Sequence, residues 1–268
     1  MKSPMDREKL LKLLPWISTP VLLIAIVGLW KFYTVVSGIS EFVIPPPEAA
    51  WTSLVDLVRQ PETWTVHVWI TLFETIVGFA IAVVTGVAVG AVLGRIFWLE
   101  LALRPLIVAM QVIPKVALIP IFVILFGFGV TSKVIIAAIL AFFPIMLNVM
   151  LGVRSVAPGH REVMRSLDAG RWQTFKHLDF HSTLPYVFAG MEVGIVFALI
   201  GAIVGEYLGA NEGLGNLVVV SLNALDAPQL FAVIILLAAL GSVLYFAVTG
   251  FKRLMIPWHD SVIQNERP

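Results

Sequence analysis

The segment EVMRSLDAGRWQTFKHLDFHSTLPYVFAG, residues 162–190, is a polar interruption in a chain that is otherwise apolar. It carries charges, histidines and helix-breaking residues, whereas the stretches on either side are long and apolar enough to lie in lipid. Of the 268 residues, 59% are hydrophobic and 13% are charged. Soluble domains hold about 45–50% apolar and about 25% charged residues, so the composition predicts an integral membrane protein.

Six apolar runs are long enough to cross a bilayer, since a transmembrane helix needs about 20 mostly apolar residues. They cover residues 13–38, 66–93, 101–126, 132–153, 186–208 and 228–250. The first run is longer than the core of a secretory signal, about 7–15 residues. No clear small-x-small cleavage site follows it, so we expect it to be retained. The sequence therefore predicts an all-α integral membrane fold with six transmembrane helices.

Two segments depart from this regular pattern. Pro105, Pro114 and Pro120 interrupt the third run, so we expect a bent or broken helix there. Residues 41–64 are too polar to cross the membrane, but apolar side chains between Trp51 and Val58 recur at helical spacing. That pattern predicts a helix lying along the membrane surface.

The distribution of basic residues predicts the orientation, because cytoplasmic segments carry the excess of Lys and Arg. With an inward N-terminus, the outward segments hold only Arg59 and Lys133 among the basic residues outside the spans. We therefore expect both termini in the cytoplasm, as tails at 1–12 and 251–268. The transmembrane region at 13–250 would include a cytoplasmic loop at 157–185.

Within this loop the pattern predicts two short amphipathic helices. Val163 and Leu167 lie one turn apart on one side of the first helix. Residues 168–170, DAG, then allow a break, since Asp and Gly tolerate left-handed backbone angles. A second apolar stripe recurs every three residues from Trp172 to Leu178, and Pro185 marks the return into the membrane. Such a hinged pair predicts a docking element; the alternative is a solvated loop that packs on its own helix ends.

The loop also carries a family resemblance. Glu162, Asp168-Ala169, Leu178, Pro185 and Gly190, with SLDAGRWQTF among them, resemble the cytoplasmic EAA loop of binding-protein-dependent ABC importer permeases. Other strings resemble the sulfonate, taurine and nitrate branch, which includes permeases for pyrimidine precursors, riboflavin and aromatic acids. They are IPPPEAAWTSLVDL, TLFETIVGF, IPKVALIPIFVILFGFGVTSK, AFFPIMLNV, LPYVFAG, GEYLGANEGLG and PWH. The glutamate in the second string and the lysine in the third favour the pyrimidine-precursor and riboflavin type.

This resemblance implies a type I importer fold and several partners: a second permease (identical or not), two cytoplasmic ATPase subunits and an external solute-binding protein. The loop would be the coupling helix, seated in a groove of the ATPase and drawn inward when the ATPase dimer closes on ATP. The residues implied for this contact are Glu162, Val163, Arg165, Ser166, Leu167, Asp168, Ala169, Gly170, Trp172 and Phe175. Two positions depart from the family pattern, since Asp168 replaces the usual Gly and Phe180-His181 the usual Pro. Gly170 would supply the displaced flexibility.

The sequence contains neither a phosphate-binding loop of the form GxxxxGK[ST] nor a cysteine. We therefore expect no cofactor on this chain and no catalysis by it; ATP and Mg²⁺ would bind the partner ATPase. A metal site at His177 and His181 would need further ligands, and Pro185 disfavours the extended helix it requires. We expect those histidines to face the ATPase or lipid headgroups, and the net charge of +1 gives no indication of nucleic acid.

Polar side chains within the spans mark candidate functional sites, because Lys or Asp at a helix centre costs about 2.5–3.5 kcal/mol on insertion scales. The candidates for lining a translocation pathway are Glu74, Lys115, Asn148 and Glu192. Glu74 and Lys115 could alternatively form a buried pair, and Asn148 could simply bond a neighbouring helix. Glu206 and Lys31 lie near the outer ends of their spans and can extend to the surface.

Three points stay open at this level. Gly86, Gly90 and Gly94 recur every four residues, which allows close helix approach within the chain or between subunits. An ion-coupled secondary transporter is the alternative function, and it would need paired carboxylates at the midplane and usually an inverted repeat. An intramembrane enzyme would need a nucleophile and base, or a metal, at membrane depth.

The favoured interpretation is a bacterial inner-membrane permease subunit of an ATP-driven importer. Its solute would be small and anionic or heteroaromatic: a sulfonate, nitrate, a pyrimidine precursor, riboflavin or an aromatic acid.

Overall fold

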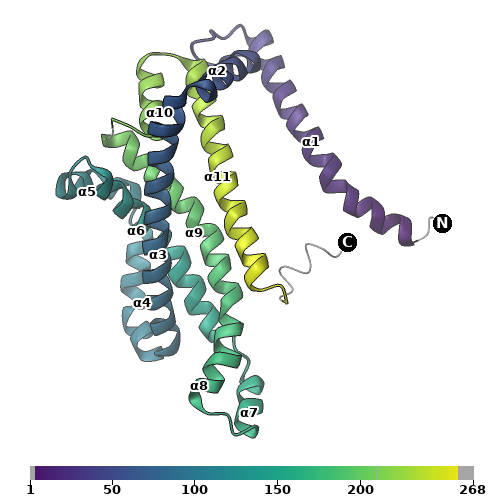
Figure 1. Ribbon diagram of the computed structural model, residues 1–268, viewed down its shortest axis with the longest axis vertical. Coiled ribbons are helices and arrows are strands. Elements are labelled where there is room, and N and C mark those ends of the chain that lie inside the picture. Colours follow the sequence, from purple (N-terminus) through teal and green to yellow (C-terminus); the bar gives the residue numbers. More distant parts are fainter. Residues whose placement is uncertain (1–3, 210, 259–268) are drawn as a thin grey trace.

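The computed structural model describes residues 4–209 and 211–258, and all regular structure within them is helical (Figure 1). Five helices are long and apolar enough to cross a bilayer. They are α1 (Pro4–Ser37), α3 (Trp69–Arg95), α6 (Val130–Arg154), α9 (Phe180–Gly209) and α11 (Ala227–Met255). Each overlaps one of the predicted runs, so the all-helical membrane fold is confirmed at this level. Parts of the expected tails, residues 1–3 and 259–268, lie outside the described residues.

The third predicted span is broken, as its prolines indicated. α4 (Phe97–Val112) is followed by the short helix η2 (Lys115–Leu118) and α5 (Ile119–Phe126), and the two halves meet at 81°. Pro114 stands at the break in an extended conformation and has no N–H to continue the α4 hydrogen-bond ladder. Counting the bent pair as one span brings the total to six.

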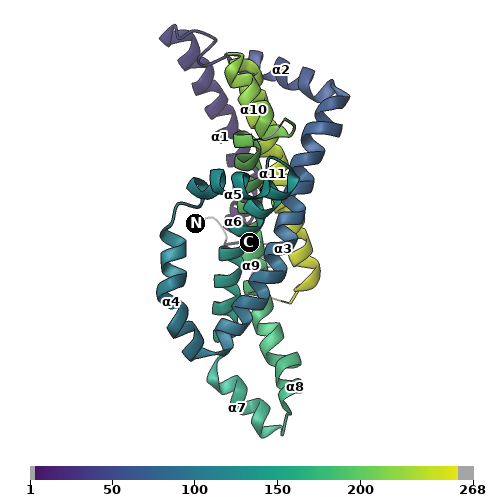
Figure 2. The same cartoon turned by 90° about the vertical axis from the view of Figure 1, so that its left-hand side faces the viewer.

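The centre of the molecule is a three-helix bundle of α3, α6 and α9, which lie side by side along the long axis (Figures 1 and 2). Its core is built from small side chains, and the fully buried ones include Ala82, Ala137 and Ala202. A Cβ atom added to Gly90 would lie 2.5 Å from the Met146 carbonyl oxygen of α6. The glycine repeat of α3 therefore provides close packing within the chain, since small residues let membrane helices approach closely.

Four shorter elements surround one end of this bundle. They are α2 (Pro47–Arg59), η1 (Thr63–Val68), α10 (Leu214–Asn223) and the start of α11. The predicted amphipathic helix is present as α2, but its buried side chains are Ala50 and Leu57, and Trp51 is exposed. Leu57 packs in a cluster with Leu214 and Val233, so α2 covers α10 and α11 through one face.

Helix α1 stands apart from the bundle and touches it only near its C-terminal end (Figure 1). Trp30 stacks on Phe231 of α11 with ring centroids 5.4 Å apart, and its Nε1 donates a hydrogen bond to the Pro45 carbonyl. Lys31 forms an ion pair with Glu48 at the start of α2. None of the side chains in the apolar segment of α1, Ile17–Ser37, is buried, as suits a helix surrounded by lipid.

Pro185 does not mark the start of a membrane helix, contrary to expectation. It lies inside α9, and an apolar helical stretch continues from Arg171 to Gly209. The preceding turn widens into the π-helical segment η3 (Phe175–Asp179), and the Thr183 hydroxyl donates to the Asp179 carbonyl oxygen at 2.7 Å. Such local adjustments let proline remain inside membrane helices.

Candidate functional site

The polar loop forms a helical hairpin that projects beyond the bundle (Figures 1 and 2). It consists of α7 (Pro158–Ser166), α8 (Arg171–Thr174) and η3, so two short helices joined at a turn are confirmed. Asp168 itself adopts the left-handed conformation, with φ of 52°. Gly170 has φ of −64°, which is not left-handed, and its N–H donates to Gln173 Oε1 at 2.8 Å. The expectation that Gly170 supplies the flexibility of the turn is therefore wrong.

The hairpin exposes several apolar side chains at its tip. Leu167 and Trp172 are each 71% exposed, and Val163 is 56% exposed. The Glu162 side chain also faces solvent and makes no ion pair or hydrogen bond with any residue that the structure describes. Other residues of the tip form hydrogen bonds with the backbone. Ser166 Oγ donates to the Glu162 carbonyl oxygen, and the Ala169 N–H donates to the Met164 carbonyl oxygen.

Phe175 and the arginines of the loop turn inward, toward the bundle. The Arg95 guanidinium lies 4.9 Å from the Phe175 ring centroid, and Asp179 accepts from Arg95 and Arg161 at 3.4 Å each. Arg165 and Arg171 line the cavity that separates the hairpin from the bundle. These contacts tie the hairpin to α3, so the predicted loop residues divide into an exposed tip and an inner face.

The histidines of the loop have other partners. His181 Nδ1 lies 2.8 Å from the Lys176 carbonyl oxygen, and its ring packs against that of Trp258. Across residues 4–209 and 211–258 there is no group of three or more His, Asp or Glu side chains placed to hold a metal ion.

A cavity of about 460 Å³ lies where α4 breaks into η2 and α5. Lys115 lines it, with its ammonium group 4.8 Å from the Phe143 ring centroid and 3.5 Å from the Gln111 carbonyl oxygen. Phe197 and Ile200 of α9 close the opposite side. The alternative that Lys115 pairs with Glu74 is wrong, because Lys115 sits against an aromatic face at the break.

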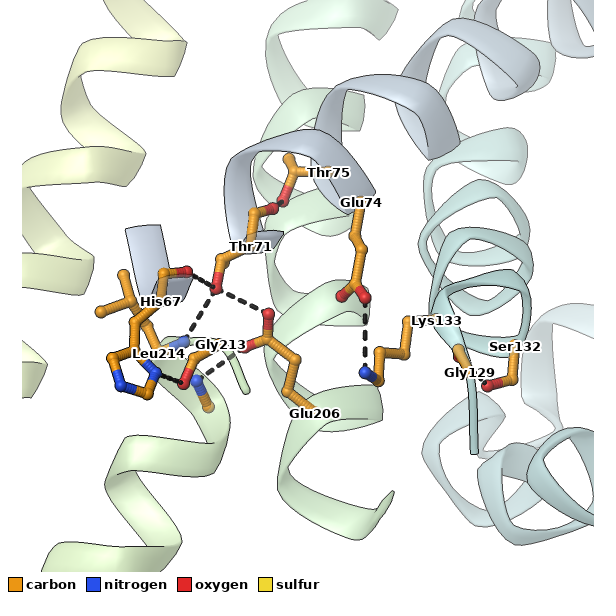
Figure 3. Close-up of polar contacts among 11 residues, drawn as sticks. His67, Thr71, Glu74, Thr75, Gly129, Ser132, Lys133, Glu206, Gly213 and Leu214 are labelled. Carbon is orange, nitrogen blue, oxygen red and sulfur yellow. Dashed lines mark hydrogen bonds and ion pairs between the residues drawn. The ribbon is translucent and has the colours of Figure 1, made fainter. Parts of the chain in front are cut away.

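Glu74 pairs instead with Lys133, at the far end of the bundle from the hairpin (Figure 3). Lys133 Nζ lies 3.4 Å from Glu74 Oε1, and the two side chains are 6% and 0% exposed. Neither Glu74 oxygen has a hydrogen-bond partner in the described part of the chain. Lys133 was expected in an outer segment, but α6 begins before it and Gly205 of α9 packs against it.

Glu206 lies beside this pair and is also fully buried, so its expected extension to the surface is wrong. Its Oε1 accepts from the Thr71 hydroxyl at 2.6 Å and its Oε2 from the Gly215 N–H at 2.6 Å. Thr71 Oγ1 in turn accepts from the Leu214 N–H at 2.9 Å. Figure 3 shows the Glu74 and Glu206 carboxyls directed into the same space between α3 and α9.

The turn before α10 allows the backbone to come this close to Glu206. Gly213 has φ of +102°, and a Cβ atom there would lie 2.3 Å from the Glu206 carboxyl. Its carbonyl oxygen also lies 3.1 Å from His67 Nδ1. We name the residues Thr71, Glu74, Lys133 and Glu206, with the backbone of 213–215, the outer polar cluster.

The last two pathway candidates have polar partners within the chain. Glu192 of α9 lies 3.3 Å from Lys252 Nζ and accepts from the Thr249 hydroxyl at 3.1 Å, both on α11. Asn148 Nδ2 donates to the Pro144 carbonyl oxygen one turn earlier, and its Cβ lies against Gly190. Neither residue lines the cavity at the α4–α5 break.

Comparison with known proteins gives a consistent result. The family model described as binding-protein-dependent transport system inner membrane component matches residues 82–258, more than half of the chain. The riboflavin transport system permease protein of Chloroflexus aurantiacus is 32% identical over 92% of each chain. The formylaminopyrimidine transport permease protein of Halalkalibacterium halodurans is 34% identical over 86% of this chain and 91% of its own. The taurine transport system permease protein of Escherichia coli is 25% identical over 90% of this chain and 89% of its own.

Proposed function

Because the chain belongs to the family of binding-protein-dependent transport system inner membrane components, we propose that it forms the translocation pathway of an ATP-driven importer. It is a multi-pass protein of the bacterial inner membrane and a permease subunit of an ABC transport system. An ATPase and an extracytoplasmic binding protein are the partners that such a system requires. Two copies, or this chain and a second permease, would enclose the pathway.

The observation that carries this proposal is the projecting hairpin with an exposed apolar tip. A helical hairpin held only by its own chain would be expected to bury Leu167 and Trp172, yet both are exposed. Glu162 beside them has no partner within the described residues and can accept hydrogen bonds from another protein. We place this tip in the groove of the ATPase, with the apolar side chains seated and Glu162 at the rim.

The charge distribution supports a cytoplasmic hairpin. The basic residues Arg95, Arg154 and Lys252 end α3, α6 and α11 at or toward the hairpin end of the molecule. Glu48, Asp56 and other acidic groups lie at the opposite end. By the positive-inside rule the hairpin end faces the cytoplasm and the outer polar cluster faces the binding protein.

For the solute, the cavity at the α4–α5 break is the strongest candidate for a contact on the pathway. It offers one ammonium group, from Lys115, and two aromatic rings, those of Phe143 and Phe197. A planar heteroaromatic or small anionic molecule matches this lining, since aromatic faces stack on rings and the ammonium attracts negative charge. The riboflavin and formylaminopyrimidine permeases named above, both more than 30% identical, are named for heteroaromatic molecules, so we propose that class.

The decisive experiment is co-purification with the ATPase encoded beside this chain, followed by ATP hydrolysis with and without loaded binding protein. We expect Glu162→Lys and Leu167→Asp to lose ATPase binding or its stimulation while the chain still inserts. Glu62→Lys is the matched control, because Glu62 is exposed at the opposite end of the molecule. Normal uptake in Glu162→Lys would contradict the docking assignment. Uptake that follows an ion gradient without ATP would favour the secondary transporter instead.

A further inference from the structure

A basic cavity of about 1050 Å³ separates the hairpin from the ends of α3 and α6. Five arginines line it: Arg95, Arg154, Arg161, Arg165 and Arg171. Asp179 is the one acidic lining residue within the described chain, and it is already paired with Arg95 and Arg161. Arg154 is paired with Glu100 at 3.4 Å. The cavity thus concentrates positive charge well beyond what its own carboxylate balances.

Arg165 and Arg171 face this cavity without a partner. Neither side chain makes an ion pair or a hydrogen bond with any residue in 4–209 or 211–258. Both residues are exposed and can reach a ligand from solvent. Guanidinium groups bind phosphate through two parallel hydrogen bonds. The chemistry of the cavity is therefore that of a phosphate site.

An apolar groove of about 450 Å³ adjoins the cavity on the side toward the middle of α3. The two share four lining residues, Arg95, Val153, Phe175 and Asp179, so they lie directly beside each other. The groove runs along α3 from Val87 to Arg95, and eight residues of helix correspond to about 12 Å. Its lining between α3, α6 and α9 is mainly apolar, with Arg95, Asp179 and Thr183 as the polar exceptions.

We propose that this composite site binds one anionic phospholipid, with the phosphate between Arg165 and Arg171 and an acyl chain in the groove. A free phosphate would fill the cavity and leave the groove empty, whereas a phospholipid matches both the charge and the apolar extension. Basic pockets between membrane helices on the cytoplasmic side are suited to anionic headgroups. The bound lipid would bridge the hairpin and the bundle, and thereby fix the hairpin at its observed distance. This inference stands on the cavity and groove alone and does not depend on transport.

The test is native mass spectrometry of the purified full chain after exchange into equal amounts of phosphatidylglycerol and phosphatidylcholine. We expect retained phosphatidylglycerol to exceed phosphatidylcholine and to fall about fivefold for each arginine removed in Arg165→Gln and Arg171→Gln. Arg253→Gln is the matched control, since Arg253 is exposed in the last turn of α11 and outside the cavity.

Filling the groove tests the acyl chain separately. Val92 lines the groove and is 47% exposed, whereas Val84 of the same helix is 71% exposed and lies outside it. Val92→Trp should lower lipid retention and Val84→Trp should not. Equal retention of the two lipids, or variants that behave like their controls, would overturn the proposal. Displacement by glycerol phosphate alone would identify a free-phosphate site and overturn it as well. So would loss of the lipid on assembly with the ATPase, because the cavity would then belong to the protein interface.

Discussion

Replacing Lys133 by Met tests whether the outer polar cluster balances its own charge. Lys133 is the one basic side chain in a buried group that also holds the carboxyls of Glu74 and Glu206. Glu206 accepts two hydrogen bonds, from Thr71 and the Gly215 N–H, but neither Glu74 oxygen has a hydrogen-bond partner in the described chain. Removing the ammonium would leave two buried acidic groups facing one another, with Glu74 deprived of its partner.

The expected cost follows from this geometry. Removing one partner of a buried ion pair destabilises a protein by about 3–5 kcal/mol, because the remaining charge is uncompensated. For a chain of this size that loss corresponds to a fall of roughly 10 °C in the unfolding temperature. Glu74→Gln should cost less, since Lys133 also attracts Glu206. The double variant Glu74→Gln with Lys133→Met should recover at least half of the loss, because the two carboxylates no longer face each other.

Circular dichroism, recorded while the purified variants are heated in one detergent, measures the loss of stability in the two single variants and in the double variant. Ser132→Ala is a matched control on the same helical turn, as its hydroxyl donates only to the Gly129 carbonyl oxygen. A loss below about 1 kcal/mol in Lys133→Met, the size of an exposed ion pair, would show that the cluster is hydrated. A double variant no more stable than Lys133→Met would refute the argument from paired charges.

Three further predictions concern other parts of the chain. Gly90→Leu should prevent folding, because its side chain would meet the α6 backbone, whereas Gly250→Leu has open space and should express normally; yield of monodisperse protein compares them. Asp168→Val should reduce ATPase stimulation and Asp168→Gly should not, since Asp and Gly tolerate a left-handed φ whereas a β-branched residue pays about 1–2 kcal/mol; a β-branched variant with full stimulation would show that the turn is not required. Lys31 lowers the pKa of Glu48, so their ion pair should persist at neutral pH and weaken only as the pH falls through that lowered pKa; a distance between spin labels on α1 and α2 that stays the same at all pH values would contradict this.

Local features of the sequence were sufficient to predict most of the helices. Apolar runs predict spans because each run buries its own backbone hydrogen bonds, whatever it packs against. The break at Pro114 and the hairpin at Asp168 were predictable for the same reason, since a missing N–H and a left-handed turn are properties of one or two residues. Pro185 shows the limit of that reasoning, because the surrounding helix accommodates it.

The outer polar cluster could not be predicted from local pattern. The Thr71–Glu206 hydrogen bond joins residues 135 positions apart, and it forms because the turn at Gly213 folds α10 back over the bundle. In the sequence, Lys133 and Glu206 stand at the ends of apolar runs, where long side chains normally extend to water. The one available signal was that acidic and basic residues occupy the same end of neighbouring spans, which permits a buried pair without specifying it.

The packing also indicates which part of the molecule can move. α3 carries Thr71 and Glu74 of the outer cluster at one end and Arg95, which contacts the hairpin, at the other. Between these ends it packs on α6 through glycines and alanines too closely for either helix to bend independently. We therefore expect a displacement of the hairpin to be transmitted along α3 to the outer cluster as a rigid-body movement.

The broken helix is less restrained by such packing than the three helices of the bundle. Glu100 is the one buried residue of α4, and α5 buries only Ile119 and Val123. The stretch between Glu100 and Ile119 contains the break, Lys115 and the cavity, and none of its side chains is buried. Moving this stretch against the bundle buries or exposes little side-chain area, so a change in access to the cavity is expected there. The hairpin would supply the displacement, the bundle would transmit it, and the α4–α5 break would open or close the pathway.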